Sequence, residues 1–145
     1  MKIAVLHGPN LGRLGERRPE VYGSTTLEQL ETSLKEEFSD VEFSFFQSNH
    51  EGALIDQLEA WHAQEIPGLI INAGALTHQS YALRDALEGL GFVAVEVHIS
   101  NIYRREPFRH VSLLAPVVAG QISGLGLTGY RLAAHYLREA LSSGT

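Results

Sequence analysis

The chain has 145 residues, of which 44% are hydrophobic and none is cysteine, and its formal net charge is −6. This length suits a single domain over residues 1–145, and the absence of cysteine excludes disulfides and thiolate metal ligands. The acidic balance argues against a nucleic-acid-binding protein, because phosphate recognition needs a basic face. No apolar stretch approaches the ~20 residues of a membrane span, and the first one breaks at Gly8-Pro9, too early for a signal peptide. We therefore expect a cytoplasmic protein without membrane contact.

Short β-rich runs alternate with helical patterns along the chain. In chain order the patterns predict a strand at 2–7, a loop at 8–24, a helix at 26–38, a strand at 41–47, a helix at 53–64, a strand at 68–72, a helix at 80–90, strands at 92–99 and 117–122, and a helix at 130–141. Such alternation is typical of a parallel sheet with helices on both faces. The pattern predicts a three-layer α/β fold, a flavodoxin-like doubly wound five-stranded parallel sheet. In such sheets ligands bind beyond the carboxyl ends of the strands.

Polar side chains collect where three predicted strands end. Asn10 follows the first strand, Asn72 and His78 follow the third, and Glu96 and His98 close the fourth. Singly, each is as well explained as a turn or helix-capping residue. Glu96 and His98 are two apart on a strand, so their side chains share a face, where a carboxylate can orient an imidazole for proton transfer. An exposed Glu–His pair on the strand rim is the alternative.

The loop at 8–24 is far longer than a usual strand–helix connection, which favours a lid or binding loop. Its four glycines and two prolines predict bends rather than a helix. It carries Arg17 and Arg18, then Tyr22. Free tyrosine ionises only near pH 10, and an adjacent guanidinium favours the ionised phenolate, so either arginine is a candidate to activate Tyr22. A loop-anchoring aromatic side chain is the alternative.

The segment IYRREPFRH follows the fourth strand and supplies Arg105 and Arg109, whose planar guanidinium groups suit a carboxylate. A solvated basic loop is the alternative. The only lysines, Lys2 and Lys35, are not placed for Schiff-base chemistry, so carbonyl chemistry would pass through an enolate.

The segment GLGLTG at 124–129 matches a dinucleotide-binding fingerprint, but only 16 residues follow it, too few to complete that unit. We interpret its glycines as tight strand–helix packing. No HExxH or similar spacing indicates a metal site, and we expect neither metal nor cofactor.

The motifs GPNLGRLG, PEVYG, NAGALTH, EVHISN and REPFRH occur in this order between positions 8 and 110. Together they resemble the type II 3-dehydroquinate dehydratase family, and GLGLTGY fits its C-terminal segment. The resemblance implies a flavodoxin-like lyase that dehydrates an anionic substrate, 3-dehydroquinate, in the shikimate pathway for aromatic amino acids or in quinate catabolism. It also implies a homododecamer built of trimers.

The resemblance implies specific roles as well. Tyr22 matches the proton acceptor, Arg17 the lid arginine that supports it, and His98 the proton donor to the leaving hydroxyl. Asn10 matches the residue that holds a water against the enolate, and Glu96 the partner of the histidine. The remaining matches lie at or near the substrate, with Asp85 reaching a neighbour's site and Ile99 acting through its backbone: Asn72, His78, Asp85, Ile99, Ser100, Arg105 and Arg109.

The chain departs from the family's pattern at Arg18, where a glutamate is usual, and at His7, where asparagine is frequent. The departure at Arg18 leaves open which of the two loop arginines faces the pocket. Two competing functions are a flavin- or nucleotide-binding module that uses the glycines near Gly124, and a non-catalytic scaffold of the same fold. Neither explains the set formed by Asn10, Arg17, Tyr22 and His98.

Overall fold

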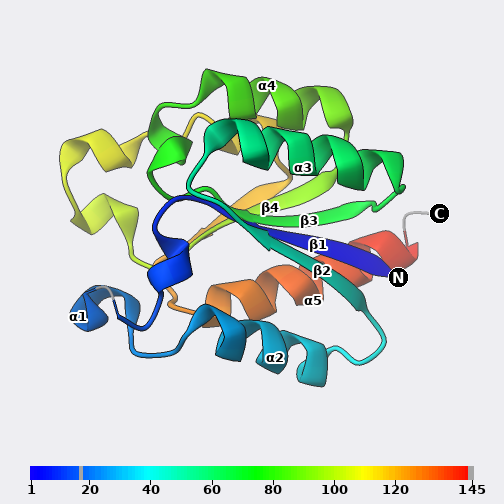
Figure 1. The fold of residues 1–145 in the computed structure, drawn as a ribbon, viewed down its shortest axis with the longest axis horizontal. Helices are drawn as coiled ribbons and strands as arrows, with labels where there is room; N and C mark the ends of the chain where they lie inside the picture. Colours follow the sequence, from blue (N-terminus) through cyan, green and yellow to red (C-terminus); the bar gives the residue numbers. More distant parts are fainter. Residues whose placement is uncertain (17, 144–145) are drawn as a thin grey trace.

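The computed structural model describes residues 1–16 and 18–143 and contains one parallel sheet (Figure 1). The five strands are β1 (Lys2–His7), β2 (Glu42–Gln47), β3 (Gly68–Asn72), β4 (Val93–His98) and β5 (Gly120–Ser123). Their order is β2-β1-β3-β4-β5, and every neighbouring pair is parallel. This order confirms the predicted flavodoxin-like doubly wound fold.

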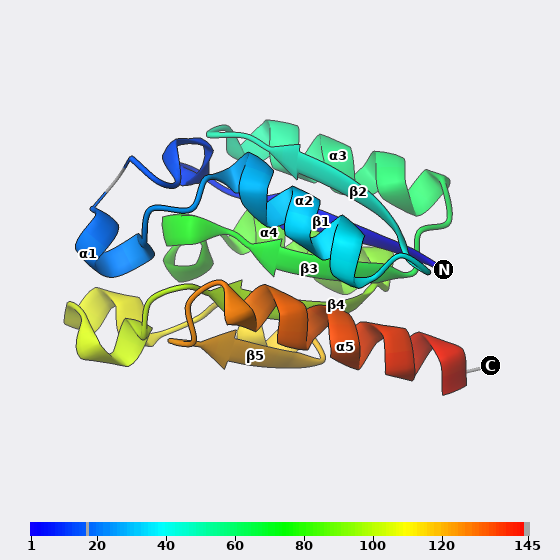
Figure 2. The same ribbon diagram turned by 90° about the horizontal axis from the view of Figure 1, so that it is seen from below.

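Helices cover both faces of the sheet and make three layers. One face carries α2 (Leu27–Glu37) and α5 (Thr128–Ser143), and the other carries α3 (Glu51–Ala63) and α4 (Tyr81–Leu90) (Figures 1 and 2). None of the helices in the described part of the chain is long and apolar enough to cross a membrane.

The strands are apolar on both faces because both are covered. In β1, Ile3 and Val5 pack in the core beneath α2 and α5, whereas Ala4 and Leu6 pack in the core beneath α3 and α4. All four side chains are fully buried. Burial of each large aliphatic side chain stabilises the fold by about 1.5–3 kcal/mol. The continuous apolar run is therefore the physical reason why β1 is an interior strand.

Local signals set the helix ends close to their predicted positions. Thr26 and Gln29 form a reciprocal capping box at the start of α2. Ser80 accepts a hydrogen bond from Leu83 N at the start of α4, and Gly91 ends that helix in the left-handed conformation.

Two predictions from the sequence were wrong in detail. The loop after β1 is not free of helix, since it contains the 3-10 turn η1 (Leu11–Arg13) and the short α1 (Pro19–Tyr22). A proline in the first turn favours such a helix, because its missing N–H needs no partner there. The last strand begins at Gly120 rather than at 117, because Ala115–Val117 forms a 3-10 turn that also has proline near its start.

The sheet order reverses between β1 and β3, and the chain needs glycine at this point. Gly8 N donates to Asn72 O over 2.7 Å, and a Cβ on Gly8 would lie 2.3 Å from Ala73 O. Any side chain at position 8 would therefore force the two strand ends apart. This is the point at which a doubly wound sheet opens a ligand crevice.

Fully buried His7 ends β1 and packs against Tyr130 of α5, with ring centroids 5.6 Å apart. Burial lowers the pKa of His7 from 6.5 to about 3. The histidine therefore stays neutral in the native protein at pH values well above 3.

This burial makes the protein sensitive to acid. Between pH 6.5 and 3 the unfolded chain binds a proton at His7 that the native chain does not, so stability is complete above pH 6.5 and falls as the pH is lowered. The loss should reach about 2 kcal/mol at pH 5. The free energy of unfolding can be measured with urea at pH 7.5 and at pH 5. Its decrease between these two pH values should be about 2 kcal/mol smaller in His7→Asn than in the wild type. The exposed His62→Asn is the control, and parallel pH profiles for His7→Asn and wild type would refute the prediction.

Candidate active site

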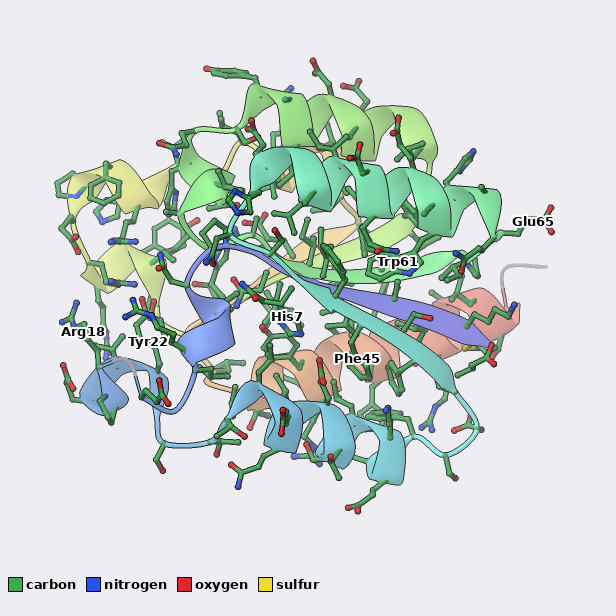
Figure 3. All side chains as sticks on the ribbon, viewed as in Figure 1. His7, Arg18, Tyr22, Phe45, Trp61 and Glu65 are labelled. Atoms are coloured by element: carbon green, nitrogen blue, oxygen red, sulfur yellow. The ribbon has the colours of Figure 1, made fainter. Side chains whose placement is uncertain are left out.

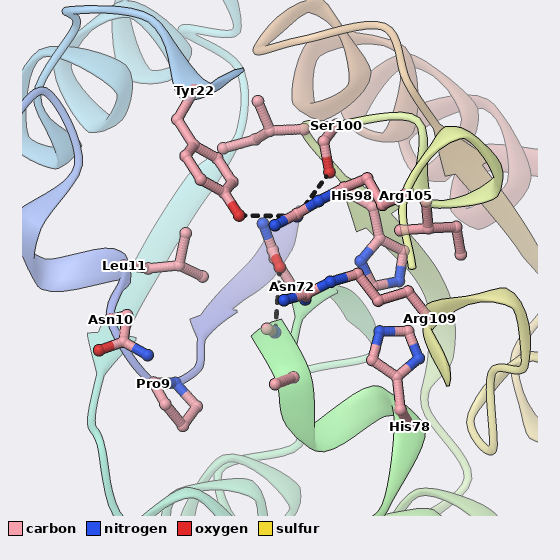
Figure 4. Close-up of a pocket in the computed structure, with 14 residues that line it drawn as sticks. Pro9, Asn10, Leu11, Tyr22, Asn72, His78, His98, Ser100, Arg105 and Arg109 are labelled. Carbon is pink, nitrogen blue, oxygen red and sulfur yellow. Dashed lines mark hydrogen bonds between the residues drawn. The ribbon is translucent and has the colours of Figure 1, made fainter. Parts of the chain in front are cut away.

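A cavity of about 190 Å³ opens at the carboxyl ends of β1, β3 and β4, beside the switch point (Figure 4). The chain after β1 contributes Asn10, the chain after β3 contributes His78, and Tyr22 enters from the long loop. Among the described residues, its lining comprises Pro9, Asn10, Leu11, Tyr22, Asn72, Gly74, Ala75, His78, His98, Ile99, Ser100, Ile102, Arg105 and Arg109. The parallel sheet thus gathers side chains that lie far apart in sequence.

His98 lies in the cavity wall with its ring held from behind by Glu96. The two side chains share a face of β4, as their spacing predicts, and His98 Nε2 makes a short hydrogen bond with Glu96 Oε2. The pair is not an exposed rim pair, because Glu96 is fully buried and His98 is 5% exposed. With Nε2 engaged by the carboxylate, Nδ1 is the ring nitrogen left to exchange a proton elsewhere.

The Glu96 carboxylate is satisfied by two hydroxyl groups besides the histidine. Thr77 Oγ1 donates to Oε2 over 2.7 Å, and Ser112 Oγ lies 2.8 Å from Oε1 and 2.9 Å from Oε2. Burial alone raises the pKa of Glu96, but the hydrogen bonds from His98, Thr77 and Ser112 outweigh it and hold the pKa below its ordinary 4.5. The carboxylate therefore stays ionised and can stabilise an imidazolium.

Tyr22 contacts Arg105, which follows β4 in the chain. Arg105 Nη1 donates to Tyr22 Oη over 2.8 Å and to Ser100 Oγ over 3.1 Å (Figure 4). The guanidinium carbon also lies 5.6 Å from the centroid of the Tyr22 ring. The phenol oxygen therefore accepts a hydrogen bond from a cationic group.

Asn72, His78 and Arg109 complete the polar wall. Asn72 Oδ1 accepts from Gly74 N over 3.1 Å, so the amide also serves the turn that follows β3. His78 Nδ1 donates to Val111 O over 2.9 Å, and burial lowers the pKa of His78, which favours the neutral ring. Arg109 Nε lies 3.3 Å from both carboxylate oxygens of Glu106 at the cavity edge.

Of the other candidate residues, Arg18 and Asp85 do not line this cavity, Glu96 lies behind His98 rather than in the lining, and one cannot be placed. Arg17 lies outside the described residues. Arg18, the alternative loop arginine, does not face the cavity; it is exposed and donates to Glu20 over 3.3 Å. Asp85 is exposed on α4 and is absent from the lining of the cavity in its own chain.

The glycines at 124–129 pack rather than bind in this structure. Gly124 N and Gly126 N donate to His98 O and Ile99 O, so these amides are not available to a phosphate. A Cβ on Gly129 would lie 3.1 Å from Val97 and 3.3 Å from Ile122. This geometry agrees with the interpretation as strand–helix packing. Among the described residues no group of three or more histidine and acidic side chains is arranged to hold a metal ion.

Sequence reasoning did not identify three side chains that contact candidate site residues. Thr77 and Ser112, which hold Glu96, carry no signal beyond being hydroxyl residues near predicted site segments. Tyr130, whose hydroxyl accepts from Asn72 Nδ2 over 2.9 Å, lies 58 residues away on α5. Only its place beside the glycine motif marks Tyr130 as close to the strand ends.

The Glu96 network predicts a pH-dependent cost for Glu96→Gln. Above the ordinary carboxyl pKa the variant should be less stable by about 1–3 kcal/mol, because an amide cannot accept all three donors. A lowered native pKa means that the Glu96 contribution is present above pH 4.5 and is lost as the pH falls through the native value. The gap in unfolding free energy between wild type and variant should therefore narrow in acid. Glu42→Gln, which changes an exposed glutamate, is the control. An equal loss of unfolding free energy in the two variants would show that the hydrogen bonds to Glu96 do not stabilise the fold.

Comparison with known proteins places the chain in a family. The protein-family model described as "Dehydroquinase class II" matches residues 1–138 of the chain. The chain is 57% identical over 141 residues to the 3-dehydroquinate dehydratase of Roseiflexus castenholzii, covering 94% of this chain and 88% of the relative. It is 52% identical over 135 residues to that of Bacillus subtilis, covering 92% and 90%. The crystal structure of type II dehydroquinase from Butyrivibrio crossotus has a TM-score of 0.92 and 45% identity, covering 95% of this chain and 97% of that one. The chain belongs to the class II dehydroquinase family.

Proposed function

We propose that this protein is a lyase that dehydrates 3-dehydroquinate to 3-dehydroshikimate in the shikimate pathway, with residues 1–145 as one catalytic domain. One observation supports this most directly: a guanidinium-bound phenol and a carboxylate-bound imidazole line the same cavity. Together they supply the base and the acid that removal of water from a β-hydroxy ketone needs. A flavin- or nucleotide-binding module has no use for this pair.

Tyr22 begins the reaction as a phenolate. It takes a proton from the carbon next to the ketone, and the C–H electron pair forms an enolate. Arg105 Nη1 donates to the phenol oxygen over 2.8 Å, which places a cation beside the proposed base. Arg17 is assigned by family resemblance to the same task when the loop closes. Asn10 holds a water against the enolate oxygen, where charge develops.

His98 completes the dehydration. The enolate collapses, the C–O bond to the β-hydroxyl breaks, and the imidazolium gives its proton to the departing oxygen, so that water leaves. Glu96 stabilises the imidazolium before transfer. One proton must then pass from Tyr22 to His98 before the next cycle. No step requires a metal or a cofactor.

The substrate is held by the rest of the cavity. Its carboxylate is an anion that Arg109 can meet, provided the guanidinium shifts from Glu106. Asn72, His78, Ser100 and the Ile99 backbone offer hydrogen bonds to its hydroxyl and carboxylate oxygens. The cavity is small and polar, which suits one compact hydroxylated acid.

The central test is turnover of purified protein with 3-dehydroquinate, followed by absorbance of the conjugated enone. We expect turnover in the presence of a chelator, and no inactivation by borohydride plus substrate. Tyr22→Phe and His98→Asn should each lower kcat by about 10²–10⁴-fold, since each removes one proton-transfer group. Tyr103→Phe, which alters an exposed tyrosine outside the cavity, is the matched control.

Full activity in a folded Tyr22→Phe variant would exclude the enolate mechanism with this base. Inactivation by borohydride in the presence of substrate would indicate an iminium instead.

We also propose that the chain acts in the cytoplasm as a homododecamer built of trimers, in which Asp85 reaches a neighbour's site. The exposed face of α4 supports this, since Tyr81 is 67% exposed beside Asp85. Sedimentation should give about twelve times the 15.9 kDa of one chain. Tyr81→Glu should reduce that mass, whereas Asp85→Asn should lower activity and leave the mass unchanged. A fully active monomer would refute the assembly.

A further inference from the structure

Three buried polar side chains form a connected row behind the cavity. They are His7 at the end of β1, Tyr130 on α5 and Asn72 at the end of β3, and their exposed fractions are 0%, 0% and 4%. Only Asn72 lines the cavity (Figure 4). Figure 3 shows His7 between the sheet and α5. The proposed reaction uses Asn72 and assigns no task to the other two.

The row holds the Asn72 carboxamide at both ends. Nδ2 donates to Tyr130 Oη over 2.9 Å, and Oδ1 accepts from Gly74 N over 3.1 Å. A flipped amide would set its NH2 group against the Gly74 N–H, donor against donor. One N–H and one lone pair remain on Asn72, and their directions in the cavity are thereby fixed.

Tyr130 can accept from Asn72 because its own proton has another partner. Its Oη lies 3.4 Å from His7 Nδ1, a weak but buried contact. Burial keeps His7 neutral, so one ring nitrogen is an acceptor, and burial also raises the pKa of Tyr130, so the phenol keeps its proton. The consistent arrangement is Asn72 N–H to Tyr130 oxygen and Tyr130 O–H to His7 Nδ1. His7 Nε2, for which the described residues offer no hydrogen-bond partner, then carries the ring proton.

We propose that Tyr130 and His7 are positioning residues for the reaction: they fix the Asn72 carboxamide in the orientation that meets a hydroxyl group of the substrate. Neither residue touches the substrate. Tyr130 holds Asn72, and His7 directs the Tyr130 proton away from it. This inference rests on the proposed function for its kinetic readout and on the structure alone for its spectroscopic one.

A double-mutant cycle on kcat/KM separates positioning from simple packing. Tyr130→Phe keeps the ring and removes the hydroxyl, and we expect kcat/KM to fall about 10-fold, the effect of one buried hydrogen bond. In an Asn72→Ala background the same change should cause no further loss, because there is no amide left to orient. If Tyr130 only supports the core, its effect should multiply with that of Asn72→Ala, and that result would overturn the proposal.

A matched pair at position 7 tests the role of the acceptor. In His7→Asn the amide oxygen can take the place of Nδ1, whereas His7→Leu has the same branching and no acceptor. We expect His7→Asn to retain kcat/KM within about 2-fold and His7→Leu to lose as much as Tyr130→Phe. Equal losses of kcat/KM in the two variants would show that His7 does not act as the acceptor for Tyr130.

A measurement without substrate keeps this inference separate from the proposed function. The Asn72 side-chain amide signals of ¹⁵N-labelled protein can be assigned by their absence in Asn72→Ala. In ligand-free Tyr130→Phe these signals should shift and their exchange with water should speed up. Unchanged signals would overturn the proposal whatever the assay shows. Shifted signals in a protein that does not turn over 3-dehydroquinate would instead reject the proposed function and leave the row intact.

Discussion

Glu96 brings a carboxylate into the interior of the fold, where a charge is tolerated only when its oxygens are hydrogen-bonded. Its partners come from three parts of the chain: Thr77 after β3, His98 on β4, and Ser112 after the arginine-bearing loop. The need to satisfy one buried carboxylate therefore ties together the segments that form one wall of the cavity. The same hydrogen bonds keep the carboxylate ionised, which makes it an effective partner for His98.

A second part of the cavity lining is organised by a positive charge, the guanidinium of Arg105. Arg105 reaches Tyr22 and Ser100, and thereby links the long loop to the segment after β4. The base and the acid of the proposed reaction thus belong to separate electrostatic units. The phenol of Tyr22 contacts a cation, Arg105, whereas the imidazole of His98 contacts an anion, Glu96.

The parts of this arrangement that depend on local sequence could be predicted, and those that depend on distant contacts could not. The strand β3 has the predicted bounds because a continuous apolar run leaves few alternatives, and Ser80 and Gly91 mark the ends of α4 by their own chemistry. The pairing of Glu96 with His98 follows from the two-residue period of a strand. By contrast, Arg105 and Tyr22 are 83 residues apart, and nothing in either segment indicates that their side chains meet.

Gly8 limits how this enzyme can be redesigned. Because Ala73 occupies the space where a side chain at position 8 would lie, libraries aimed at new substrates should leave that position unchanged. His78 and Arg109 lie on short turns outside the sheet, where exchange of a side chain does not disturb the meeting of β1 and β3. Substrate range should therefore evolve mainly through those turns, while the strand ends stay constant.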